Sequence, residues 1–136
     1  MGRMLKLVLL ACCSAWLGAA AQSGAVAYGK YLVEEVAKCQ ECHTPRAATG
    51  ELDKTKWLKG AMIDFQPDRE NKQWRKVAPD LTASGDLFTR WREDGMVRYL
   101  ETGTGPSGHS AQPPMPAYKL RPHDAEAIVA YLKTLK

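Results

Sequence analysis

Cys39-Gln40-Glu41-Cys42-His43 combines two cysteines, three positions apart, with a histidine directly after the second. Each cysteine of such a pair can add to a vinyl group of one porphyrin, and the histidine is then held beneath the iron as its proximal ligand. Cys-x-x-Cys alone also occurs in zinc sites and in thioredoxin-like redox pairs. No cysteine follows Cys42 to complete a zinc site, and the neighbouring sequence lacks a βαβ pattern. The stretch therefore predicts one c-type haem, attached through Cys39 and Cys42, with His43 on the iron.

The first 21 residues have the order of a secretory signal peptide. Arg3 and Lys6 precede a run of apolar and small residues from Leu7 to Ala21, and Ala19-Ala20-Ala21 offers a cleavage site. The run of about 15 residues is short for a bilayer span, which needs roughly 20. We therefore expect a signal peptide at 1–21, export to the periplasm and a domain at 22–136.

Two alternatives would leave the protein on a membrane. The N-terminal segment could be retained as an uncleaved anchor. Leu9-Leu10-Ala11-Cys12 also resembles a bacterial lipobox, in which Cys12 becomes a lipidated N-terminus. Against lipidation, few apolar residues precede Cys12 and the apolar run continues well beyond it.

Cleavage after Ala21 removes 21 of the 136 residues and leaves 115, the size of one compact domain. It also removes Arg3, Lys6 and no acidic residue, so the formal net charge falls by two from +4. No basic run with interleaved aromatic residues is present, and we expect no nucleic-acid binding. Cys12 and Cys13 leave with the signal peptide, so both remaining cysteines are committed to haem.

Helical periodicity appears at both ends of this domain. Apolar and small residues from Val26 to Ala37 follow one helical face, which predicts a helix from about Ala25 to Lys38 that ends at the haem motif. A last helix is predicted around Ala125 to Leu135, with Pro122 in its first turn. A third is predicted over Arg92 to Thr102, ended by Gly103 and preceded by a turn at Phe88 to Trp91.

The segment from Thr44 to Leu87 holds several glycines and prolines and no alternating strand pattern, which predicts loops with short helical turns. So long an irregular segment is unusual in a compact domain unless a haem serves as the core that the loops enclose. Trp57, Trp74 and Trp91 are expected to line or cap this core. The indole N–H of Trp57 or Trp74 is also a candidate donor to a haem propionate.

The sixth iron ligand has five candidates in the sequence: Met62, Met96, Met115, His109 and His123. Met115 lies in Pro113-Pro114-Met115-Pro116, where prolines on both sides stiffen the backbone and can hold a thioether at a fixed place. We expect Met115 to be the ligand. Met96 fits a core position of the third helix better, and His123 an exposed helix start.

Taken together, these motifs resemble class I c-type cytochromes, which carry one haem. The resemblance covers nearly all of the chain from Ala25 to Lys136. It rests on Gly29-Lys30-Tyr31-Leu32, Ala78-Pro79-Asp80-Leu81-Thr82, Trp91 with Tyr99-Leu100-Glu101-Thr102-Gly103, Met115-Pro116-Ala117-Tyr118, and Asp124 to Leu132.

The resemblance implies an all-α cytochrome c fold in which the N- and C-terminal helices cross, with a third helix and long loops around one covalent haem. It also implies that Gly29 admits Tyr131 where the helices cross, and that the loop from Ala78 to Thr82 lies on the haem edge. The mitochondrial type has a Gly-Pro pair after the haem motif whose proline carbonyl orients the proximal histidine. No such pair follows at that distance here, so the backbone carbonyl that accepts from His43 Nδ1–H is not identified.

The pattern is most similar to bacterial cytochrome domains that serve alcohol, sugar and molybdenum-containing dehydrogenases. This narrower resemblance implies a dehydrogenase as electron donor and a cytochrome or an oxidase as acceptor.

With His43 and Met115 both on the iron, no site remains open for a substrate, which favours one-electron transfer over enzyme activity. The alternative is a haem enzyme or gas-binding sensor with an open or labile sixth site. An enzyme of this kind would need an exchangeable ligand or a second haem motif.

Overall fold

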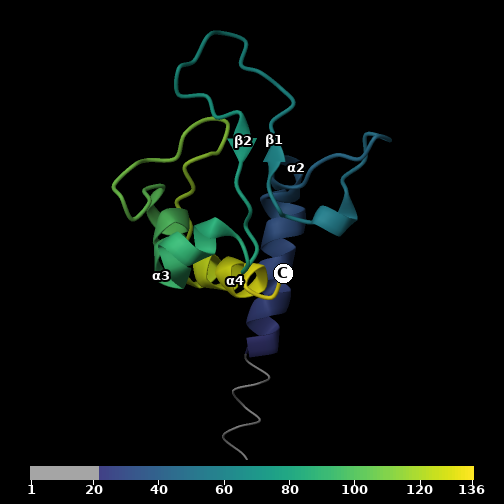
Figure 1. The fold of residues 1–136 in the computed structure, drawn as a ribbon. Coiled ribbons are helices and arrows are strands. Elements are labelled where there is room, and N and C mark those ends of the chain that lie inside the picture. Colours follow the sequence, from purple (N-terminus) through teal and green to yellow (C-terminus); the bar gives the residue numbers. More distant parts are fainter. Residues whose placement is uncertain (1–21) are drawn as a thin grey trace, which may run out of the picture.

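The computed structural model describes residues 22–136, so the predicted signal peptide and the possible lipidation site at Cys12 lie outside the described residues. Within this part of the chain, no helix is both long and apolar enough to cross a membrane. Figure 1 shows the helix at 22–31, α3 (Asp86–Thr102) and α4 (Pro122–Leu132) gathered on one side, and the loops, with α2 (Gln40–His43) and two short strands, on the other. The elements in chain order are a helix at 22–31, the π-helical turn η1 (Leu32–Val36), α2 (Gln40–His43), η2 (Lys54–Lys56), β1 (Ala61–Met62), β2 (Val77–Ala78), α3 (Asp86–Thr102) and α4 (Pro122–Leu132).

The N-terminal helix and α4 cross in contact, as the sequence predicts (Figure 1). The contact requires glycine at position 29, because a Cβ there would lie 1.8 Å from the carbonyl oxygen of Ala127. The same Cβ would lie 3.0 Å from the Cβ of Tyr131, so the predicted pairing of Gly29 with Tyr131 is confirmed. The hydroxyl of Tyr131 donates to a carboxylate oxygen of Glu34, which adds a hydrogen bond between α4 and η1, the turn that follows the N-terminal helix.

The first helix does not continue regularly to Lys38 as predicted. It widens into η1, where the N–H of Ala37 donates to the carbonyl of Leu32, 2.8 Å away. Lys38 then takes a left-handed conformation with φ of 53°. The N–H of Cys39 still reaches back to the carbonyl of Val33 at 3.0 Å. This wide turn leads the chain from the helix into the haem motif on α2.

Helix α3 begins earlier than predicted and is broken in the middle. Its first part starts at Asp86, so the expected turn at Phe88 to Trp91 is wrong. Leu87 and Phe88 are buried in the core, and this burial favours a helical turn that presents both side chains to one side. The break falls at Arg92, with φ of 58° and ψ of 179°. The predicted end is confirmed, since Gly103 caps the helix with φ of 72°.

Helix α4 begins with Pro122 in its first turn, as predicted, where the missing N–H of proline costs no helical hydrogen bond. Asp124, also in the first turn, accepts a hydrogen bond from the hydroxyl of Tyr28 at 3.0 Å. This bond ties the start of α4 to the N-terminal helix.

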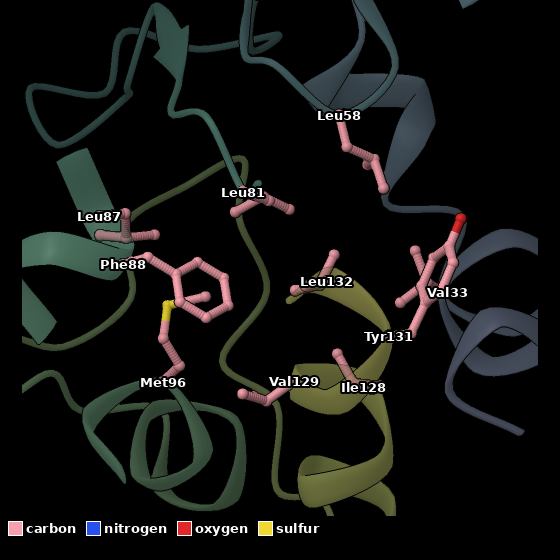
Figure 2. Close-up of a cluster of buried hydrophobic side chains, with 10 residues drawn as sticks. All are labelled: Val33, Leu58, Leu81, Leu87, Phe88, Met96, Ile128, Val129, Tyr131 and Leu132. Carbon is pink, nitrogen blue, oxygen red and sulfur yellow. The ribbon is translucent and has the colours of Figure 1, made fainter. Parts of the chain in front are cut away.

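The core lies between α3, α4 and η1 (Figure 2). Phe88 and Met96 of α3 lie on one side of it, and Val33 and Tyr131 on the other. Apolar residues of α4 fill the space between them, and the loops add two leucines. The ten buried residues are Val33, Leu58, Leu81, Leu87, Phe88, Met96, Ile128, Val129, Tyr131 and Leu132.

The middle of the chain is mostly irregular, as the sequence predicts. It contains one feature that the sequence pattern could not show, an antiparallel pair of two-residue strands in which Ala61 faces Ala78 and Met62 faces Val77. Strands this short are below the length at which alternation becomes visible. They bring residues on both sides of the outer loop next to α2.

Candidate haem site

A cavity of about 570 Å³ opens between the haem motif, the β1–β2 pair, α3, α4 and the segment from Ser107 to Leu120. Its walls include Cys39, Cys42, His43 and Met115, the four residues that the sequence selects. Apolar side chains from α3 and α4 complete the wall, among them Leu87, Met96, Ile128 and Leu132. The fold therefore brings a motif near one end of the domain and a methionine near the other end to the same space.

His43 is held by a hydrogen bond that sequence reasoning did not identify. Its Nδ1 lies 2.8 Å from the carbonyl oxygen of Pro79, 36 residues later, so Nδ1–H is the donor. The side chain is 5% exposed, and burial lowers the pKa of His43 while the Pro79 carbonyl partly opposes this. A neutral ring with a protonated Nδ1 leaves Nε2 as a metal ligand.

We expected a backbone carbonyl to accept the hydrogen bond from His43, and this is confirmed. The accepting carbonyl belongs to Pro79 in Ala78-Pro79-Asp80-Leu81-Thr82, a loop that the resemblance placed only on the haem edge. No spacing rule in the sequence pointed to Pro79. Pro79 follows β2, and the pairing of β2 with β1, which contacts α2, brings the Pro79 carbonyl to Nδ1 of His43.

The two cysteines lie at the start of α2 and within it, and neither forms a disulfide. Burial raises the pKa of the Cys39 thiol to about 11. The pKa of Cys42 is also raised, by burial first and then by the carboxylates of Glu41 and Asp64, while Arg46 opposes them. Both sulfurs are therefore neutral thiols at pH 7 before they react.

Arg46 joins three segments beside Cys42. Its guanidinium lies 3.1 Å from a carboxylate oxygen of Glu41 and 3.5 Å from one of Asp64, and it donates to the carbonyl of Gly50 at 3.0 Å. Sequence reasoning missed this cluster, since the three side chains meet only when the loop folds back on α2.

Met115 lies far from the haem motif in the sequence but in the same cavity. The proline-rich loop around it is held by backbone bonds: the N–H of Met115 donates to Gln112 at 3.1 Å, and the N–H of Arg75 donates to Pro113 at 2.7 Å. A side chain on a loop fixed in this way needs little reorganisation to reach a ligand position.

The other candidates for the sixth ligand are placed differently. Met62 is 70% exposed on β1, and His123 stacks on Tyr28 with ring centres 5.4 Å apart, outside the cavity. Met96 lines the cavity but is a buried member of the core beside Phe88 (Figure 2). His109 lines the cavity, is exposed, and lies 3.1 Å from the hydroxyl of Ser107.

The three tryptophans named in the sequence analysis also differ in whether they line the cavity. Trp91 lines the cavity, as predicted, and also packs against the hydrophobic core. Trp57 packs against the hydrophobic core but does not line the cavity. Trp74 instead packs edge-on against Phe65 in the outer loop, so its predicted role as a core residue is wrong. Neither Trp57 nor Trp74 lines the cavity.

The chain resembles a known protein family over nearly all of its described residues. Residues 26–136 match the sequence model of the family described as cytochrome c. The chain belongs to the cytochrome c family. The expected fold is confirmed, and residues 26–136 form a domain of the electron-carrying cytochrome c type.

Curated relatives point the same way. The chain is 34% identical over 110 residues to a diheme cytochrome c-type protein of Cereibacter sphaeroides, covering 77% of this cytochrome and 33% of that protein. It is 34% identical over 113 residues to the fructose dehydrogenase cytochrome subunit of Gluconobacter japonicus, covering 79% and 21%. It is 35% identical over 114 residues to a nicotinate dehydrogenase subunit of Pseudomonas putida, covering 79% and 9%. This cytochrome thus spans a third or less of the length of these relatives.

The cavity fits the covalent haem that a cytochrome c domain implies. Its volume lies within the range of cofactor pockets, and its wall is mainly apolar, as a porphyrin face requires. The donor set also fits: two thiols for attachment and one histidine whose second nitrogen is already engaged by Pro79.

Proposed function

We propose that this cytochrome transfers one electron at a time through a single haem, attached through Cys39 and Cys42, with His43 and Met115 as the two axial iron ligands. The observation that carries the proposal is the shared cavity, which is lined by all four residues although Met115 is far from the motif in the sequence. The bound haem supplies an iron that accepts and releases a single electron.

The protein's own residues keep this site closed to other chemistry. Pro79 fixes the ring of His43, and the loop from Gln112 to Pro116 presents Met115. Two protein ligands leave no iron position for oxygen, peroxide or a substrate. For this reason we propose an electron-transfer protein without enzyme activity of its own.

We further propose that its partners are redox proteins: a dehydrogenase as donor and a cytochrome or oxidase as acceptor. Support comes from the named dehydrogenase subunits among its relatives. The location that fits this role is the periplasm, after removal of residues 1–21 as a signal peptide, with 22–136 as the haem domain. The intact mass of the exported protein tests this boundary: cleavage after Ala21 with one haem added is expected, whereas retention of Cys12 with a lipid would refute it.

An optical spectrum of the purified, exported protein tests the iron ligands. A ferric absorption band near about 695 nm, which arises from thioether ligation, and no change when carbon monoxide is added to the reduced form are expected. A missing ferric band with a clear carbon monoxide shift would refute His/Met ligation. The haem enzyme or gas sensor would then become the better explanation.

A further inference from the structure

Two exposed arginines line the cavity, and no carboxylate of the described residues matches their charges. Arg75 precedes β2 and Arg90 lies in the first part of α3, and both line the cavity. Neither forms an ion pair with any carboxylate of residues 22–136. The Arg90 guanidinium has a hydrogen bond from Nε to the carbonyl of Asp86, at 3.4 Å, which does not neutralise its charge.

Lys38 also lines the cavity and carries a positive charge, but this charge is already matched. The ammonium group of Lys38 lies 3.1 Å from a carboxylate oxygen of Glu35. His109 shares a hydrogen bond with Ser107. The two arginines are therefore the lining residues of this described domain with unmatched positive charge.

The fold also holds the backbone of both arginines in place beside the cavity. The N–H of Arg75 donates to Pro113 at 2.7 Å, which ties it to the loop that carries Met115. Arg90 is followed by Trp91, and the ring of Trp91 packs closely on Gly105. A Cβ at position 105 would lie only 3.1 Å from this ring. Each guanidinium thus starts from a backbone that is fixed at the cavity wall.

A haem brings two carboxylates into this cavity, and a carboxylate near an apolar wall needs a cation with hydrogen-bond donors. Guanidinium groups match a carboxylate with two parallel N–H donors. Trp57 and Trp74, the two alternative candidate donors in the sequence, lie outside the cavity lining. We infer that Arg75 and Arg90 bind the haem propionates of this cytochrome.

This inference rests on the proposed haem site and makes a separate prediction. Replacing Arg75 or Arg90 by glutamine removes a positive charge beside the haem, so the oxidised form becomes relatively more stable. At a fixed applied potential, the ratio of ferrous to ferric protein should fall roughly threefold to tenfold in each variant at low ionic strength. Arg75→Lys and Arg90→Lys keep the charge and should recover most of that loss.

Two arginines outside the cavity serve as matched controls. Arg69 lies in the same outer loop as Arg75, and Arg98 lies in the same helix as Arg90. Neither residue lines the cavity, so Arg69→Gln and Arg98→Gln are the control variants. Both control variants should keep the wild-type redox equilibrium in a spectroelectrochemical titration.

Infrared difference spectra of protein containing haem labelled with ¹³C at the propionate carboxyls distinguish pairing from a charge that acts only at a distance. The labelled bands should shift in Arg75→Gln and Arg90→Gln and stay in place in the controls. A glutamine variant with attached haem, unshifted labelled bands and a wild-type redox equilibrium would overturn the assignment for that residue. Failure to attach haem in the wild-type protein would instead refute the proposed function itself.

Discussion

His43 depends for its orientation on Pro79, a residue 36 positions later in the sequence. The bond at 2.8 Å fixes the tautomer before a metal binds. Met115 is positioned through the backbone of its loop. The two ligands are therefore expected to respond differently to substitution.

Met115→Ala should leave the haem attached, because attachment depends on Cys39 and Cys42. Loss of the thioether opens one iron position and removes a ligand that favours the ferrous state, so the reduction potential should fall. Ferrous protein should then bind carbon monoxide. Met62→Ala, at an exposed position outside the cavity, is the control. If Met115→Ala kept the ferric thioether band, the assignment of Met115 would be wrong.

Tyr131 gives a pH-dependent prediction. Burial, and then its hydrogen bond to Glu34, raise the pKa of Tyr131 from 10.0 to about 12. Because folding favours the neutral phenol, this contribution to stability is complete below pH 10 and is lost as the pH rises through 12.

The free energy of unfolding of wild-type protein should therefore fall relative to that of Tyr131→Phe between pH 10 and 12. At neutral pH the variant should be less stable by about 1 kcal/mol, since its hydrogen bond to Glu34 is missing. Tyr31→Phe, at an exposed position, should follow the wild-type curve. Parallel curves for wild type and Tyr131→Phe above pH 10 would contradict the prediction.

Helix crossings set the geometry of the elements. The N-terminal helix approaches α4 so closely that position 29 admits only a hydrogen atom. The π-helical turn η1 follows directly, and it places Val33 in the core and Glu34 against Tyr131. The crossing thus fixes the position of the N-terminal helix and, through η1, the position at which the haem motif begins.

Gly29→Ala should destabilise the holoprotein by about 3 kcal/mol, because α4 must move to relieve a contact of 1.8 Å with the Ala127 carbonyl. Gly24→Ala, on the same helix with no atom within 4 Å of the new methyl group, should cause no loss. Thermal unfolding monitored at the haem band provides the comparison. Equal midpoints for the two variants would show that the helices tolerate a wider crossing.

The elements were predictable from the sequence to different degrees, for physical reasons. Helix α4 was predictable because its apolar period and its first-turn proline agree. The turn η1 was not, since a hydrogen bond one residue longer than the α-helical one leaves no mark in the pattern. The start of α3 was missed because burial of Leu87 and Phe88, and not local preference, makes it helical.

At the scale of the whole molecule, the sequence singles out Cys39, Cys42, His43 and Met115 as candidates because their chemistry is specific and their spacing is short or rigid, and the fold brings all four to one cavity. The sequence does not single out Pro79 and Arg75, because each reaches the cavity only through the pairing of β1 with β2. Residues that act through tertiary placement carry no sequence signature of their own.

The apolar wall of the cavity predicts how the protein behaves without haem. Without the porphyrin, the side chains of this wall, among them Leu87, Ile128 and Leu132, would face water and lose the apolar contacts that stabilise them. The double variant Cys39→Ala with Cys42→Ala, expressed without haem, should therefore lack fixed tertiary packing. Its near-ultraviolet circular dichroism should be weak, and a cooperative unfolding transition equal to that of the holoprotein would contradict this.

The crossing of the N-terminal helix with α4 also orders events in time. The haem motif is synthesised early, whereas Met115 and α4, which close the cavity, arrive later. Until α4 docks on Gly29, the cavity lacks the part of its wall that Ile128 and Leu132 supply. The order of the elements along the chain thus leaves a period in which haem can enter the cavity. This period ends when α4 docks on the N-terminal helix.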